Sequence, residues 1–135
     1  MADSVLALLE ASRIREKAQT RLYRILAARA ESEGRSSLAE RFNDLHADEQ
    51  HHLSKLTARM LELGASLSDA ESEIIPSPEL DDWEEQVRSR EEAEVAWYEE
   101  SLKEEMDPST RILLQEILES EKSHARELGG KWMSA

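Results

Sequence analysis

The chain of 135 residues contains no cysteine, which excludes disulfides, thiolate-bound metals, iron–sulfur clusters and a cysteine nucleophile. Glycine and proline are also scarce, with 4 and 3 residues, so few positions interrupt regular structure. Basic residues are outnumbered, because 17 Lys and Arg stand against 30 Asp and Glu and give a formal net charge of −13. Nucleic acids and anionic membrane surfaces repel such a chain, so we expect neither as a partner.

Long apolar runs are missing as well. No stretch approaches the roughly 20 apolar residues of a membrane span, and the apolar run over residues 5–9 is too short for the core of a signal peptide. We therefore expect a cytoplasmic protein. The 39% of apolar residues still suffice for a core, and the length predicts one domain over residues 1–135.

Cap and turn signals divide the chain into four predicted helices, and no stretch alternates with period 2 for long enough to be a strand. The predicted helices cover about residues 4–32, 37–63, 78–106 and 108–128. The signals are Gly34, a capping box of Ser37 and Glu40, Gly64, Ser77-Pro78, Asp107-Pro108 and Gly129-Gly130. The fold class is therefore all-α.

The lengths of the connections predict the topology. The first two helices are joined by about four residues and the last two by about two, and such short loops make neighbouring helices antiparallel. The connection over residues 65–77 can span roughly 43 Å at about 3.3 Å per residue. A 27-residue helix is only about 40 Å long. We expect a four-helix bundle of two antiparallel hairpins, about residues 4–64 and 78–128, joined by a long crossover.

The apolar face of each predicted helix contains ionisable residues near its middle. In the second helix, apolar residues recur at steps of three and four, and Glu49 and His52 occupy two places in that series. The other helices follow the same pattern with Glu16, with Glu91 and Glu94, and with Glu121 and His124. Buried carboxylates require a compensating charge. Since no Lys or Arg lies in these series in helices two to four, a bound cation is predicted, and Glu and His without sulfur suit iron, manganese or zinc.

An internal repeat supports this interpretation. The midpoint of Glu16 and Glu49 is residue 32.5, and that of Glu91 and Glu121 is residue 106. Each midpoint lies at a predicted turn between two helices. When a hairpin closes, its two carboxylates therefore lie at the same height along the helices. Tyrosine occurs twice in the chain and falls in the same register both times. One copy has Glu16, Tyr23, Glu49 and His52, and the other has Glu91, Tyr98, Glu121 and His124. The competing interpretation is a metal-free acidic bundle in which each Glu-x-x-His is accidental, since Glu is abundant.

At these residues the chain resembles the ferritin-like superfamily and, within it, the rubrerythrin group, over about residues 4–128. The resemblance implies a centre of two iron ions, with manganese or zinc as alternatives. It implies six ligands, of which Glu49 and Glu121 bridge the two ions. The set is Glu16, Glu49, His52, Glu91, Glu121 and His124.

The same resemblance implies three further roles. Glu94 matches a rubrerythrin carboxylate that exchanges with a histidine ligand when the metal changes oxidation state, and Gln19 occupies the corresponding place in the first half. Glu92 is the competing candidate for this extra ligand. Tyr23 and Tyr98 resemble the tyrosines that hydrogen-bond the ligand carboxylates. The remaining histidines, His46 and His51, are expected at the surface.

The activity implied by the resemblance is that of a di-iron oxidoreductase that reduces peroxide or dioxygen. The alternative within the same class is a ferroxidase that oxidises Fe²⁺ and passes Fe³⁺ on. The chain lacks the four cysteines of a rubredoxin domain, so we expect a separate electron donor. We also expect a homodimer or a higher homo-oligomer.

Overall fold

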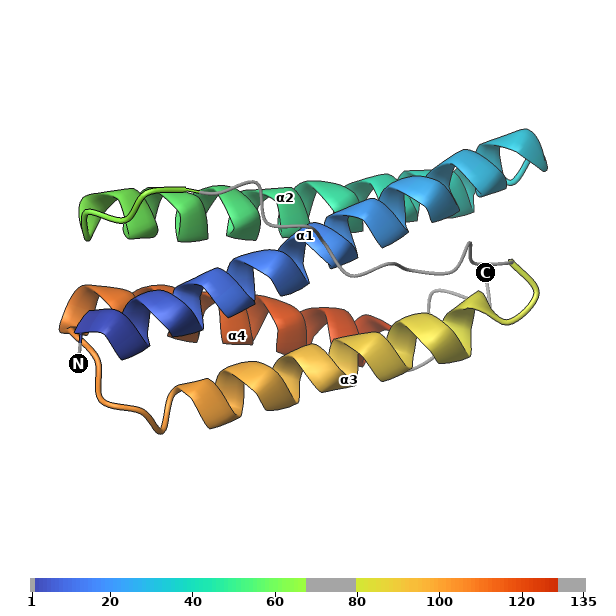
Figure 1. The fold of residues 1–135 in the computed structure, drawn as a ribbon. Coiled ribbons are helices and arrows are strands. Elements are labelled where there is room, and N and C mark those ends of the chain that lie inside the picture. Colours follow the sequence, from blue (N-terminus) through green and yellow to red (C-terminus); the bar gives the residue numbers. More distant parts are fainter. Residues whose placement is uncertain (1, 68–79, 129–135) are drawn as a thin grey trace. The chain divides into compact units, whose positions relative to one another are not determined.

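The computed structural model describes residues 2–67 and 80–128, and within these ranges all regular structure is helical. Helix α1 spans Ala2–Ser32, α2 spans Ser36–Glu62, α3 spans Trp83–Ser101 and α4 spans Pro108–Glu127 (Figure 1). The predicted all-α class with four helices is confirmed. None of these helices combines the length and the hydropathy that a membrane span requires.

The chain divides into two compact units, Met1–Asp81 and Asp82–Ala135, and each unit contains one helical hairpin. In the first hairpin α1 and α2 lie side by side and run in opposite directions, and α3 and α4 do the same in the second (Figure 1). The predicted antiparallel pairs are therefore correct. Most of the predicted crossover over residues 65–77 lies outside the described residues.

Two glycines end the helices of the first hairpin. Gly34 has φ +74° and Gly64 has φ +85°, a left-handed conformation that costs glycine little. After α1, the N–H of Gly34 donates to Glu31 O at 3.0 Å, and the next N–H, of Arg35, donates to Ala30 O at 2.9 Å. These bonds satisfy carbonyls that the end of a helix leaves without partners, so both predicted breaks follow from backbone chemistry.

The predicted start of the second helix is wrong in its detail. Helix α2 begins at Ser36, its N-cap is Arg35, and no side chain caps it. The pair Ser37 and Glu40 therefore does not form a capping box. The turn at Gly34 already directs the chain into the helix, so Ser37 lies inside the first turn.

The third helix is shorter than predicted at both ends. Residues 80–82 form a turn, and α3 starts at Trp83 with Glu84 and Glu85 in its first turn, where carboxylates favour the positive end of the helix dipole. The predicted start at residue 78 lies outside the described residues. The last turn of α3 contains no basic residue, and Glu99 and Glu100 there oppose further extension.

The link between α3 and α4 is therefore six residues long, 102–107, where the sequence predicted about two. The guanidinium of Arg111 stabilises this link, because Nη1 donates to Leu102 O and Nη2 to Glu104 O, both at 2.8 Å. At its end, Asp107 caps α4 as predicted. Its carboxylate accepts from the backbone N–H of Thr110 at 3.0 Å and from the Thr110 hydroxyl at 2.7 Å, and Pro108 follows it.

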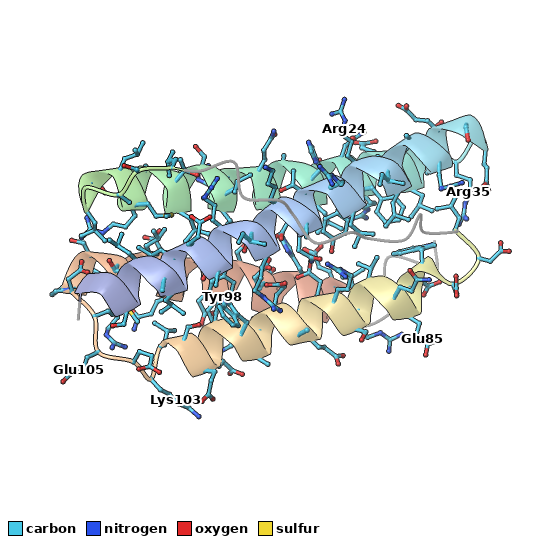
Figure 2. All side chains as sticks on the ribbon, viewed as in Figure 1. Arg24, Arg35, Glu85, Tyr98, Lys103 and Glu105 are labelled. Atoms are coloured by element: carbon cyan, nitrogen blue, oxygen red, sulfur yellow. The ribbon has the colours of Figure 1, made fainter. Side chains whose placement is uncertain are left out.

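The predicted apolar faces are the buried faces. Two leucines are exceptions: Leu63, at the end of the predicted apolar series of the second helix, is 36% exposed, and Leu102, at the end of that of the third helix, is half-buried. Charged side chains away from these faces, such as Arg24, Glu85 and Lys103, point outward (Figure 2). The core thus contains leucine and the two tyrosines, together with a set of buried ionisable residues. That set is Glu16, Glu49, His52, Glu91, Glu94, Glu121 and His124.

Candidate metal centre

Three ionisable side chains of the first hairpin converge in its core. Glu16 comes from the middle of α1, and Glu49 and His52 come from adjacent turns of α2, where a spacing of three places them on one face. Both carboxylates are 0% exposed. His52 Nδ1 lies 3.5 Å from Glu16 Oε2 and 3.6 Å from Glu49 Oε1. We call this set the first half-site.

The second hairpin repeats the arrangement with Glu91 from α3 and with Glu121 and His124 from α4. Both carboxylates are again 0% exposed. His124 Nδ1 lies 3.7 Å from Glu91 Oε2 and 3.0 Å from Glu121 Oε1. We call this set the second half-site, and its agreement with the first shows that the sequence repeat is also a structural repeat.

The spacing of the donor atoms suits a metal ion. In each half-site, one ligand atom from each of the three side chains lies within 4.8 Å of the others. Ligands about 2.1 Å from one ion, at angles of about 90–110°, are roughly 3.0–3.4 Å apart. Three of the four nitrogen–oxygen distances, at 3.5 to 3.7 Å, are longer than good hydrogen bonds and close to this separation. Imidazole nitrogen and carboxylate oxygen are ligands for iron, manganese and zinc.

The electrostatics of the second half-site also favour a positive charge. Burial by itself lowers the pKa of His124. Two effects of Glu121 and Glu91 act in the opposite direction, namely their hydrogen bonds to the imidazole and their negative charges. These effects are larger than that of burial and raise the pKa to about 11. Without metal, this imidazole therefore carries a proton at neutral pH. A cation that binds through Nδ1 replaces that proton and meets the same two carboxylates.

Of the two candidates for an extra carboxylate, one lies inside the hairpin and one outside. Glu94, one turn after Glu91, is 3% exposed, whereas Glu92 is exposed. Gln19, which corresponds to Glu94 in the first hairpin, is 0% exposed. The two hairpins therefore differ at equivalent positions, where one buries a carboxyl group and the other a carboxamide.

Both tyrosines of the repeat are completely buried. Tyr23 stacks against Phe42 of α2, with ring centroids 6.4 Å apart and planes inclined by 26°, so its ring helps to join α1 to α2. Tyr98 occupies the corresponding place on α3, two turns after Glu91. Their predicted hydrogen bonds to ligand carboxylates stay a prediction.

The histidines outside the half-sites differ from each other. His51 is exposed, as expected, whereas His46 is only half-exposed and contacts the neighbouring helix. Its Nδ1 lies 3.0 Å from the backbone carbonyl oxygen of Thr20 on α1. Sequence periodicity alone gave no signal for this contact, because position 46 borders the apolar face of α2 without belonging to it.

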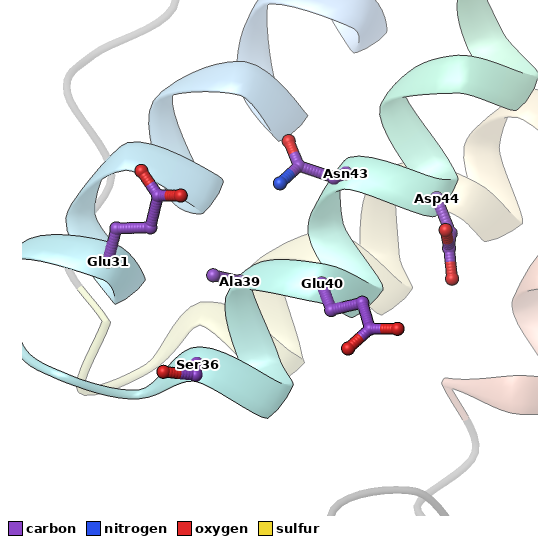
Figure 3. A pocket seen from close by; sticks show the side chains of 6 residues that line it. All are labelled: Glu31, Ser36, Ala39, Glu40, Asn43 and Asp44. Atoms are coloured by element: carbon purple, nitrogen blue, oxygen red, sulfur yellow. The ribbon is translucent and has the colours of Figure 1, made fainter.

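A surface depression of about 230 Å³ lies near the turn between α1 and α2, lined by Glu31, Ser36, Ala39, Glu40, Asn43 and Asp44 (Figure 3). Its three carboxylates point in different directions and most of its residues are exposed. It contains none of the half-site residues, so we do not regard it as the functional centre.

A helical fold with repeated Glu and His sets in its core defines the class of ferritin-like proteins. The bacterioferritin BfrA of Mycobacterium tuberculosis has a similar structure, with a TM-score of 0.86 and 21% sequence identity over 93% of this chain and 82% of that chain. The likeness assigns the fold as a ferritin-like four-helix bundle.

The rubrerythrin family model matches residues 7–130, and the chain belongs to the rubrerythrin family. No curated protein matches the chain by sequence. The family and the fold confirm the resemblance that the sequence motifs indicated.

Proposed function

We propose that this protein is a non-haem di-iron oxidoreductase that reduces peroxide, or dioxygen, at a carboxylate-rich iron centre. The observation that carries the proposal is the pair of buried half-sites, each with two glutamates and one histidine on equivalent positions of a hairpin. Membership of the rubrerythrin family supports it.

In this proposal the two hairpins form one domain and contribute jointly to one dinuclear centre. Four carboxylates offset the charge of two divalent cations, and His52 and His124 each bind one ion through nitrogen. Glu49 and Glu121 are the proposed shared ligands, and Glu94 adds a further carboxylate. Tyr23 and Tyr98 are proposed to orient the ligand carboxylates by donating hydrogen bonds.

When bound, two ferrous ions supply the two electrons that convert peroxide to water. The reaction also consumes two protons for each peroxide, giving two molecules of water. The 135 residues contain no cysteine, so re-reduction relies on an electron donor outside them. The burial of the half-sites would keep bulk water away from the reacting oxygen atoms, and their carboxylates would hold the cations.

The first test is the metal content after anaerobic reconstitution with Fe²⁺. We expect two iron ions per chain, and about one in each single variant His52→Ala and His124→Ala. Competition with Mn²⁺ and Zn²⁺ then identifies the preferred metal. A purified chain with far less than one metal ion after this treatment would contradict the proposal and favour the metal-free acidic bundle.

The second test concerns peroxide turnover and uses two neighbouring glutamates of α3. Glu94→Gln is expected to lower the rate of peroxide reduction at least tenfold while two iron ions stay bound. Glu92→Gln is the matched control, since Glu92 is exposed on the same helix, and it should behave like the wild type. Equal rates in all three proteins would remove Glu94 from the mechanism.

The alternative is a ferroxidase that handles iron, and the similarity of the fold to a bacterioferritin favours it. Steady-state kinetics with Fe²⁺, a reductant and either oxidant distinguish the two activities. Fast, catalytic consumption of peroxide without accumulated Fe³⁺ supports the peroxidase. Stoichiometric accumulation of Fe³⁺, with slow peroxide consumption, supports the ferroxidase.

A further inference from the structure

One side-chain hydrogen bond joins α1 and α2 beside the first half-site. The carbonyl of Thr20 can only accept, so Nδ1 of His46 donates the proton of this 3.0 Å bond. The Thr20 hydroxyl in turn donates to Glu16 O at 2.8 Å. The bond therefore links His46 to the turn of α1 that follows Glu16.

The position of this bond matters because it lies one turn from two proposed ligands. Thr20 is four residues after Glu16 on α1, and His46 is three residues before Glu49 on α2, so each neighbours a ligand on its own helix. A bond between Thr20 and His46 opposes sliding of α1 along α2. Such sliding changes the distance between the Glu16 and Glu49 carboxylates directly.

The second hairpin has apolar residues at the equivalent positions. Val95 follows Glu91 by four residues and Leu118 precedes Glu121 by three, and neither side chain forms hydrogen bonds. Leu118 is 8% exposed and packs as part of the core. Apolar packing is not directional, whereas a hydrogen bond fixes both distance and angle. The two hairpins therefore differ at these equivalent positions, since the Leu118 side chain cannot donate the bond that His46 donates.

We propose that His46 is a positioning residue that fixes the helix register of the first half-site, through a bond that Leu118 at the equivalent position cannot donate. The inference rests on the proposed function, since it concerns the affinity of the same centre for metal. It assigns His46 no contact with metal or substrate. Its effect reaches the metal only through Glu16 and Glu49.

The test measures binding of Co²⁺ alone to the full chain in two backgrounds. His124→Ala leaves the first half-site intact, and His52→Ala leaves the second. His46→Leu removes the donor and keeps the bulk of the side chain. His46→Asn keeps a nitrogen donor attached to Cγ, as Nδ1 is in histidine.

In the His124→Ala background, His46→Leu is expected to weaken Co²⁺ binding by about 2- to 12-fold, the range of one neutral hydrogen bond. His46→Asn should restore the affinity to within about 2-fold. In the His52→Ala background the weakening by His46→Leu should be clearly smaller, because only the proposed shared ligand Glu49, and not Glu16, would carry the change to the remaining ion. Leu118→Ala, a packing defect in the second hairpin, serves as the structural control and should weaken binding more in the His52→Ala background than in the His124→Ala background.

Two results overturn the inference. The first is equal weakening by His46→Leu in both backgrounds, which indicates general destabilisation. The second is unchanged affinity in the His124→Ala background. If either result is obtained and the wild type still binds two Co²⁺ ions, the proposed function survives and only the role of His46 is wrong. A wild type that binds no Co²⁺ refutes the proposed function and this inference together.

Discussion

Replacing Glu49 by glutamine is expected to raise the thermal stability of the metal-free protein and to abolish most of its stabilisation by metal. Glu49 is 0% exposed and shares its half-site with a second carboxylate, Glu16, and a single imidazole. Glutamine has nearly the same shape and no charge, so the substitution removes one buried charge and leaves the packing in place.

The free energy of unfolding of the metal-free protein is expected to rise by about 1–3 kcal/mol. This is part of the several kcal/mol that burial of an ion costs in a protein. An unfolding entropy of about 2.1 cal/mol/K per residue gives roughly 0.28 kcal/mol/K for this chain. The melting temperature in excess chelator should therefore rise by about 4–11 °C. Bound metal stabilises the wild type by about 2.7 kcal/mol per ion at 100 times the dissociation constant, or about 10 °C, and the variant should lose this response.

Differential scanning calorimetry of both proteins, with chelator and with Fe²⁺ under anaerobic conditions, measures the two effects. Glu40→Gln is the matched control, because Glu40 is an exposed glutamate on the same helix. It should shift the melting temperature by less than about 2 °C and leave the metal response unchanged. A Glu49→Gln protein that melts well below the wild type in chelator would falsify the reasoning, because Glu49 would then stabilise the metal-free core.

Two further predictions concern the second hairpin. Asp107→Ala should lower the free energy of unfolding, measured in urea, by about 1–2 kcal/mol, because it removes the cap of α4. Ser37→Ala removes no cap and should change this free energy by less than about 0.5 kcal/mol. Equal effects of the two substitutions would contradict the cap assignment. Arg111→Met removes two hydrogen bonds to the link over residues 102–107, so amide exchange there should become at least about tenfold faster. Arg126→Met, at an exposed position of α4, should leave this exchange unchanged.

Helix number, helix type and the buried faces were predictable because they depend on local chemistry. Gly34 and Gly64 end helices through a backbone conformation that glycine adopts at little cost, and Asp107-Pro108 starts one through a cap and a fixed φ. The half-sites were predictable for the same reason. A spacing of three on a helix places Glu49 beside His52 wherever that helix packs.

The errors arose where two local signals competed or where a contact joined distant residues. Ser37 carries a cap signal, but the turn at Gly34 starts the helix one residue earlier. The extent of α3 depends on its acidic ends and on Arg111, nine residues beyond Leu102, whose carbonyl it binds. The bond from His46 to Thr20 joins residues 26 apart, and no periodicity encodes it.

The sequence by itself determined that the chain forms four helices and which face of each is buried, because both follow from the spacing of residues within a helix. It also determined the Glu and His identity of the candidate ligands. Only the tertiary structure decided that Glu94 is buried and Glu92 exposed, and that His46 of α2 donates a hydrogen bond to Thr20 of α1. These depend on helix rotation and on contacts between helices, which are set when the faces pack and not by the order of residues alone.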